Sequence, residues 1–199
     1  MNNNKLDISL NFLILSHNYL SLVRNALEEA IKQGNVFVVI KKHEISEKEL
    51  TEETKWNDFN IIVPILYNFY HGVELLIKGF LILINDYNLK ITHDIRTLLN
   101  DFCNNYNKEI EIIRLLNKYV DISLMPEILS KFLTENKINV NEFYIFLRYP
   151  FDVRNKKKFI YYQLHGNEEE GLNLFKEIVS DIDILIPKIV KLYREKENQ

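Results

Sequence analysis

The chain has 199 residues, of which 47% are hydrophobic, enough to bury one substantial core without requiring a second domain. Five Gly and four Pro, against 12 Phe and 11 Tyr, supply few tight turns and many large side chains, which favours long packed helices and an all-α fold. The formal net charge of −3 excludes a protein coated in positive charge, so any nucleic-acid binding would need a local basic patch.

The first predicted element is a helix over residues 6–33, ended by Gly34 as a C-terminal cap. The run Val36–Ile40 is β-branched and aromatic and too short for a stable helix, so it predicts a strand. Its expected partner is Phe159–Leu164, and we expect the two to form a small two-stranded ribbon on the side of an up-and-down helical bundle. The apolar residues of the first helix recur at spacings of three and four and predict its buried face: Ile8, Phe12, Leu15, Tyr19, Leu22, Ala26 and Ala30.

A polar, acidic stretch at residues 46–56 predicts a short exposed helix or loop, because Ser46 and Glu49 have the spacing of a capping box. Thr92 is the predicted N-cap of a later helix, and Tyr149-Pro150 ends another. The further predicted helices cover residues 108–120, 126–134, 140–148 and 168–195, the last one bent at Pro187.

The stretch Phe59–Ile84 is so apolar that it predicts a central core helix, with Pro64 near its start. Its length also fits a membrane span. However, His71, Glu74 and Lys78 would then lie near the bilayer centre, where each charged group costs roughly 2.5 to 3.5 kcal/mol. We therefore expect no membrane segment.

These three polar residues lie within about 60° of one another around the predicted helix and form one narrow stripe. A buried Glu74 needs a cation, and either Lys78 or Arg148 is the expected partner. The residues also include metal-ligand types, but no histidine follows a glutamate by three positions, as carboxylate-bridged dimetal bundles require. We expect no metal and no cofactor. The predicted structural network comprises Glu74, Lys78, His93, Asp94, Arg148 and Asp152.

A basic turn followed by aromatic residues has the ingredients of a surface for single-stranded nucleic acid. The same residues also make an ordinary solvated turn that leads into a strand, and the sequence leaves both interpretations open. The candidate contact residues are Arg154, Lys156, Lys157, Lys158 and Tyr161.

Several short motifs occur in a characteristic order along residues 57–190. They are Glu74-x-x-x-Lys78, His93-Asp94-Ile95 at the start of a helix, and Tyr144-x-x-x-Arg148-Tyr149-Pro150-x-Asp152, followed by a long terminal helix. In this order the motifs resemble the HEPN superfamily. That resemblance implies a helical bundle, often homodimeric, that serves prokaryotic toxin–antitoxin, defence or RNA-processing systems. Many HEPN proteins are metal-independent ribonucleases that use Arg, four to six residues, then His.

That ribonuclease motif is absent, because none of the six arginines has a histidine five to seven positions downstream. The leading interpretation is a single HEPN-like domain over residues 1–199, with its core at 57–190 and the helix at 6–33 packed on it, acting as a non-catalytic binding or interaction module. One alternative is a ribonuclease with a rearranged site, in which Arg148 meets His71, His93 or His165 through the fold. Another is a helical scaffold for a partner enzyme. We expect a homodimer that binds a protein partner or RNA.

The expected location is cytoplasmic. The single cysteine, Cys103, cannot form an internal disulfide, and no basic-then-apolar leader opens the sequence.

Overall fold

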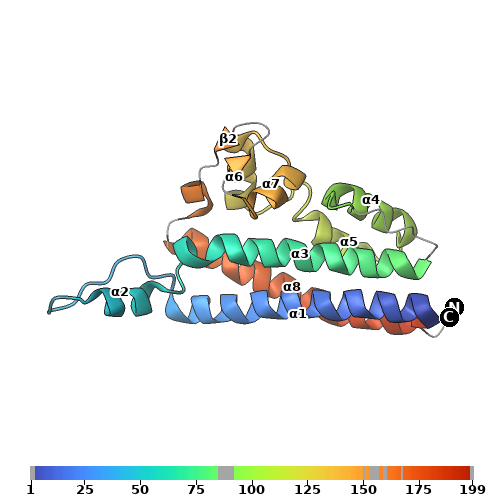
Figure 1. The fold of residues 1–199 in the computed structure, drawn as a ribbon, viewed down its shortest axis with the longest axis horizontal. Coiled ribbons are helices and arrows are strands. Elements are labelled where there is room, and N and C mark those ends of the chain that lie inside the picture. The colour runs from blue at the N-terminus through green and yellow to red at the C-terminus, as the bar shows by residue number, and fades with distance from the viewer. Residues whose placement is uncertain are drawn as a thin grey trace.

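Three long helices lie side by side along the long axis of the molecule, and shorter helices cover the uppermost of them in the view of Figure 1. In this computed structural model the described residues are 3–84, 92–149, 151–152, 157–158, 161–166 and 168–197. The long helices are α1 (Asn3–Gln33), α3 (Asp58–Ile84) and α8 (Glu168–Glu197). Helix α1 runs antiparallel to the other two, and its contact with α3 is the most extensive in the molecule. The predicted all-α helical bundle is therefore confirmed.

The shorter helices follow the sequence pattern closely, although their ends differ by a few residues. Ser46 caps α2, its side chain accepting a hydrogen bond from the backbone N–H of Glu49, and α2 buries no residue. Helix α4 is capped by Asp94 and not by the predicted Thr92, whose hydroxyl instead accepts from the N–H of Asp94. The bounds are Glu47–Thr54 for α2, Ile95–Asn105 for α4, Ile110–Asn117 for α5, Glu127–Asn136 for α6 and Val140–Phe146 for α7.

Helix α3 is the core of the bundle and is buried on most of its circumference, with Pro64 in its second turn. By length and composition α3 could cross a membrane, but 61% of its most apolar window is buried against other helices. This burial is typical of the central helix of a soluble protein. Aromatic side chains from neighbouring helices and the turns after them pack around it, among them Phe102, Tyr106, Tyr119, Phe143 and Tyr144.

Two glycines let α1 approach α3 closely. A Cβ atom at Gly79 would lie 2.7 Å from Cδ2 of Leu13, and one at Gly72 would lie 3.0 Å from Cδ2 of Leu20. The hydroxyl of Ser9 donates a 2.8 Å hydrogen bond to the carbonyl oxygen of Gly79, and that of Ser16 donates a 2.7 Å bond to the carbonyl of Gly72. Both pairs repeat every seven residues, so the two antiparallel helices stay in register over two turns of contact.

The buried face of α1 is not the one that the apolar spacing predicted. Of the predicted residues only Ala30 is buried, and Ile8, Leu15 and Leu22 are exposed. The cause is the close approach of α3, because the serine hydroxyls hydrogen-bond to its backbone and bring the adjacent stripe inward. The buried stripe consists of Ser9, Leu13, Ser16, Leu20, Val23, Leu27 and Ala30.

The predicted β ribbon was wrong. Residues 36–40 form no strand, and Val38 and Ile40 are exposed. Its expected partner is the short 3₁₀ helix η1 (Tyr161–Leu164), with residues 159 and 160 outside the described residues. Instead, β1 (Phe151–Asp152) pairs antiparallel with β2 (Lys157–Lys158). Pairing across a short connection costs less loop-closure entropy than pairing segments far apart in the chain.

Candidate functional site

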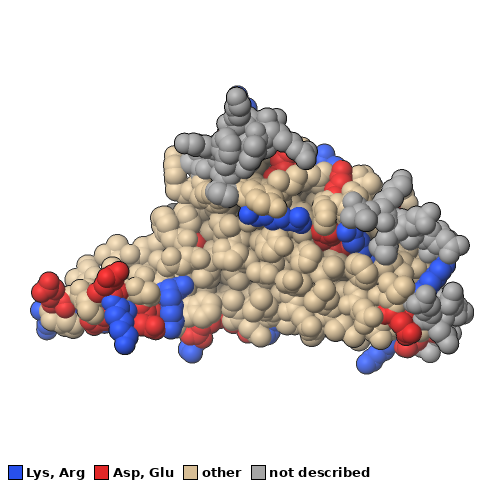
Figure 2. Space-filling model, viewed as in Figure 1, with Lys and Arg blue, Asp and Glu red and all other residues tan. Residues whose placement is uncertain are grey.

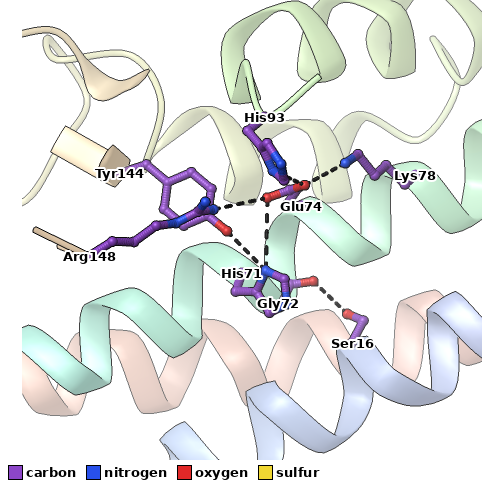
Figure 3. A network of polar contacts seen from close by, with 8 residues as sticks. All are labelled: Ser16, His71, Gly72, Glu74, Lys78, His93, Tyr144 and Arg148. Carbon is purple, nitrogen blue, oxygen red and sulfur yellow. Dashed lines mark hydrogen bonds and ion pairs between the residues drawn. The ribbon is translucent and has the colours of Figure 1, made fainter. Parts of the chain in front are cut away.

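The central helix contributes a buried carboxylate and two of the side chains that gather around it. Glu74 lies on α3 between His71 and Lys78, and its side chain is only 2% exposed. The end of α7 and the turn after it bring Tyr144 and Arg148 to the same place (Figure 3). His93, in the loop before α4, completes what we call the Glu74 network: His71, Glu74, Lys78, His93, Tyr144 and Arg148.

The two oxygens of the Glu74 carboxylate have different partners. Oε1 accepts a 2.5 Å hydrogen bond from Nζ of Lys78 and lies 2.9 Å from Nδ1 of His93. Oε2 lies 3.9 Å both from a terminal nitrogen of Arg148 and from Nδ1 of His71. Among the described residues, Oε2 of Glu74 and Nε of Arg148 are buried without a hydrogen bond. Arg148 therefore keeps donor capacity that its ion pair does not use.

The surroundings of Glu74 favour its charged form. Burial alone would raise the pKa of the carboxyl group, but His71, Lys78 and Tyr144 outweigh burial and lower the pKa to about 2. Burial, reinforced by the negative charge of Glu74, raises the pKa of Tyr144 above its usual value. The carboxylate is thus ionised at neutral pH while the phenol beside it stays protonated.

Aromatic rings hold the outer members of the network in place. The guanidinium of Arg148 lies over the ring of Tyr144, 4.3 Å from its centroid, and 5.7 Å from that of Tyr67. Nδ1 of His71 is 2.9 Å from the hydroxyl of Tyr144, and its ring packs edge-on against Tyr19. The side chains of His93, Arg148 and His71 are 51%, 25% and 21% exposed. The part of the network that meets solvent therefore carries imidazole and guanidinium groups.

The other two residues that were predicted to belong to the structural network, Asp94 and Asp152, are not members of the Glu74 network. Asp94 caps α4 by accepting a hydrogen bond from the backbone N–H of Thr97. Asp152 belongs to β1, and its side chain is outside the described residues.

Most of the candidate nucleic-acid contact residues also have side chains that lie outside the described part of the structure. Arg154 and Lys156 are not among the described residues, and only the backbone of Lys157 and Lys158 is, in β2. Tyr161 is half-buried, and its ring packs against that of Phe146, with 4.5 Å between the two centroids. Across the described part of the chain, no group of three or more His, Cys, Asp and Glu side chains is placed to hold a metal ion.

A second buried polar cluster was not predicted from the sequence. Oδ1 of Asp58, at the start of α3, lies 3.4 Å from Nδ1 of His165, whose ring stacks on Phe59. The side chain of Asn35 accepts a hydrogen bond from the N–H of Asp58. His165 also lines a surface pocket of about 500 Å³ between α6 and α8. These residues come from three distant segments, so no spacing signals the cluster.

Sequence spacing could have identified two residues to which the sequence analysis gave no role: Tyr144 of the Glu74 network, and Tyr67, whose ring packs against it. Tyr67 precedes His71 by four residues, and Tyr144 precedes Arg148 by four, which is the spacing of neighbours on a helix face.

Comparison of the chain with protein-family models, with curated proteins and with solved structures found no match. The resemblance to HEPN proteins therefore remains a prediction from the residues alone.

Proposed function

We propose that this protein is a non-catalytic HEPN-like binding module whose Glu74 network binds the phosphate groups of RNA. The observation that carries the proposal is an imbalance of charge. One deeply buried carboxylate, that of Glu74, is in contact with two permanent cations, Lys78 and Arg148. Among the described residues, the next carboxylate along the chain is that of Asp94, which is engaged in capping α4. The solvent-facing side of the network is therefore positive, although the whole chain is slightly acidic.

Arg148 is the residue best suited to contact a phosphate. Its side chain is partly exposed, and its position is fixed over Tyr144. A guanidinium forms charge-assisted hydrogen bonds to phosphate oxygens. His93 lies on the same carboxylate and adds a second donor when it is protonated. The resemblance to HEPN proteins further suggests where this module works. We propose that it acts in the cytoplasm of a prokaryote, in a defence, toxin–antitoxin or RNA-related system.

The direct test is the binding of a fluorescently labelled single-stranded RNA, followed by anisotropy at low salt in the presence of EDTA. We expect Arg148→Gln to raise Kd about tenfold and to reduce the salt dependence of log Kd by about 0.7 to 1. The matched control is Arg114→Gln, because Arg114 is exposed on α5 outside the network. Equal effects of the two substitutions, or no binding by the wild-type protein, would contradict the proposal.

A specific observation favours a second candidate function, a metal-independent ribonuclease. Two imidazoles, His71 and His93, and the guanidinium of Arg148 lie around the same carboxylate. In such a reaction one histidine removes the proton from the 2′-hydroxyl, which attacks the phosphorus, and the other protonates the departing 5′-oxygen. Arg148 would stabilise the charge that develops on the phosphorane. Since Nδ1 of each ring faces the network, Nε2 is the nitrogen available for proton transfer.

The two candidates differ in what happens to RNA after it binds. Incubation of mixed RNA with the purified protein in EDTA should leave the RNA intact if the protein is a binding module. Cleavage that His93→Ala and His71→Ala abolish, while binding persists, would instead support the ribonuclease. If RNA neither binds nor is cleaved, a helical scaffold for a partner enzyme becomes the better interpretation.

A further inference from the structure

The pocket between α6, η1 and α8 shares no lining residue with the Glu74 network, and its volume of about 500 Å³ is typical of sites that bind small molecules. Four carboxylates line it, from Glu127 and Glu135 on α6 and from Glu170 and Glu177 on α8. Among the described residues of the lining they face a single lysine, Lys131. The pocket is therefore acidic and favours a ligand that carries positive charge.

The contacts that two of these carboxylates already make leave acceptor capacity for a ligand. Glu135 accepts a hydrogen bond from the side-chain amide of Gln163, and Glu177 lies 2.8 Å from Nζ of Lys118. An ionised carboxylate has about four lone-pair sites, so one donor does not saturate it. On the arm around α2, at the left of Figure 2, acidic and basic side chains are instead interspersed. The lining of the pocket lacks that balance of charge.

The spacing of the carboxylates favours an extended cation over a single ion. Glu127 and Glu135 are separated along α6, and Glu170 and Glu177 along α8, by about 10 to 12 Å at the rise of an α-helix. A metal ion needs its ligands within one coordination sphere. A flexible chain with several cationic groups can instead meet the four carboxylates separately.

Apolar side chains share the lining with the charged groups. Pro126, Ile128 and Leu174 line the same pocket, together with the ring of Tyr162, which is 67% exposed. Methylene groups gain free energy when they are buried on such a surface, and the face of an aromatic ring attracts an ammonium group. The combined lining is complementary to ammonium groups joined by short aliphatic chains.

His165 gives the pocket a fixed polar group. Its side chain is only 8% exposed, and its ring stacks on Phe59 with 3.8 Å between the centroids. Nδ1 is buried and faces Oδ1 of Asp58 at 3.4 Å, and none of the described residues hydrogen-bonds to the ring. In the neutral ring, a carboxylate beside Nδ1 favours the tautomer that carries the proton there. Nε2, on the opposite edge, is then an acceptor that an ammonium group can satisfy.

We propose that this pocket binds an aliphatic polyamine, a chain of methylene groups that carries several ammonium groups. The carboxylates of α6 and α8 bind the ammonium groups, one of which donates a hydrogen bond to Nε2 of His165. Asp58 is a positioning residue, because it holds the imidazole from behind without touching the ligand. Since the pocket is separate from the Glu74 network, this inference does not depend on the binding of RNA.

The test is isothermal titration calorimetry of spermidine into the RNA-free, full-length protein in about 0.15 M NaCl, which screens diffuse attraction between exposed charges. The wild-type protein should show saturable binding. Glu127→Gln combined with Glu170→Gln removes one carboxylate from each wall and should raise Kd about tenfold or more. The matched control is Glu44→Gln combined with Glu47→Gln, because both residues are exposed outside the pocket. It should leave Kd unchanged, and circular dichroism would confirm that both variants are folded.

His165→Gln separates a specific site from a diffuse acidic surface, because it removes the imidazole acceptor but no carboxylate. We expect it to raise Kd for spermidine about tenfold, and an equal concentration of Mg²⁺ should not displace spermidine from the wild-type protein. Displacement by Mg²⁺ would overturn the proposal, since it would show that the pocket collects any cation. So would the absence of spermidine binding, an unchanged Kd in His165→Gln, or a control variant as weak as the pocket variant. If His165→Gln does not fold, the two carboxylate variants still decide the outcome.

Discussion

Nδ1 of His93 lies 2.9 Å from Oε1 of Glu74, although 19 residues separate them in the sequence. The same oxygen accepts the hydrogen bond from Lys78, one turn further along α3. A single buried atom therefore joins the core helix to the loop that leads into α4. Since the Glu74 side chain is almost completely buried, the stability of its charge depends on these partners.

Lys78→Met should be the most destabilising single change in the Glu74 network. It removes the direct partner of a buried carboxylate, and we expect a loss of about 3 to 5 kcal/mol in the free energy of unfolding, measured by urea denaturation. The control is the double variant Glu74→Gln with Lys78→Met, which leaves no unpaired buried carboxylate and should be more stable than Lys78→Met alone. A double variant that loses the sum of both single effects would contradict this account.

Arg148→Ala should have a smaller effect, because Lys78 still neutralises Glu74 and the Arg148 ion pair is the longer one, at 3.9 Å. The contact of the guanidinium with Tyr144 is also lost, so we expect about 1 to 2 kcal/mol in thermal or urea melts. Arg114→Ala, at an exposed position on α5, should change stability by less than about 0.5 kcal/mol. Equal, small shifts for both variants would mean that Arg148 has no structural role.

The low pKa of Glu74 should appear as an acid-sensitive part of the stability. Folding lowers this pKa from 4.5 to about 2, so the folded state favours the ionised form. The resulting stabilisation is present above pH 4.5 and is lost as the pH falls toward about 2. Urea midpoints measured between about pH 5 and about pH 3 should therefore fall more steeply for the wild-type protein than for Glu74→Gln, which cannot titrate there. Parallel curves for the two proteins would show that Glu74 does not contribute.

Gly79→Ala should destabilise the contact between α1 and α3 more than Gly72→Ala does. The added methyl group would lie 2.7 Å from Cδ2 of Leu13 at position 79, but 3.0 Å from Cδ2 of Leu20 at position 72. Alanine gains about 1 kcal/mol in helix propensity, whereas overpacking a core costs about 1 to 3 kcal/mol. We expect a net loss at position 79 and a change near zero at position 72, both measured by urea denaturation. A stabilised Gly79→Ala variant would show that α1 can move away at no cost.

The sequence alone determined most of the helices, because helix signals are local. Gly34 ends α1, Ser46 caps α2, and the long apolar run predicts α3 as the core helix, as the structure has them. The polar residues of α3 were also evident, since charged groups stand out within an apolar run. For the same reason, the i,i+4 contact of Glu74 with Lys78 follows directly from the geometry of one helix.

Only the tertiary structure decided how these helices face one another. Helix α1 carries two stripes at the same spacing, and the hydroxyls of Ser9 and Ser16 select the buried one by bonding to the backbone of α3. The run Val36–Ile40 forms no strand, and residues 161–164 of its expected partner form η1 against α6. The contact of Asp58 with His165 likewise depends on how the packed core brings together segments that are distant in the sequence. Such contacts depend on the relative placement of whole helices, which is set by the summed packing of many side chains and not by any local pattern.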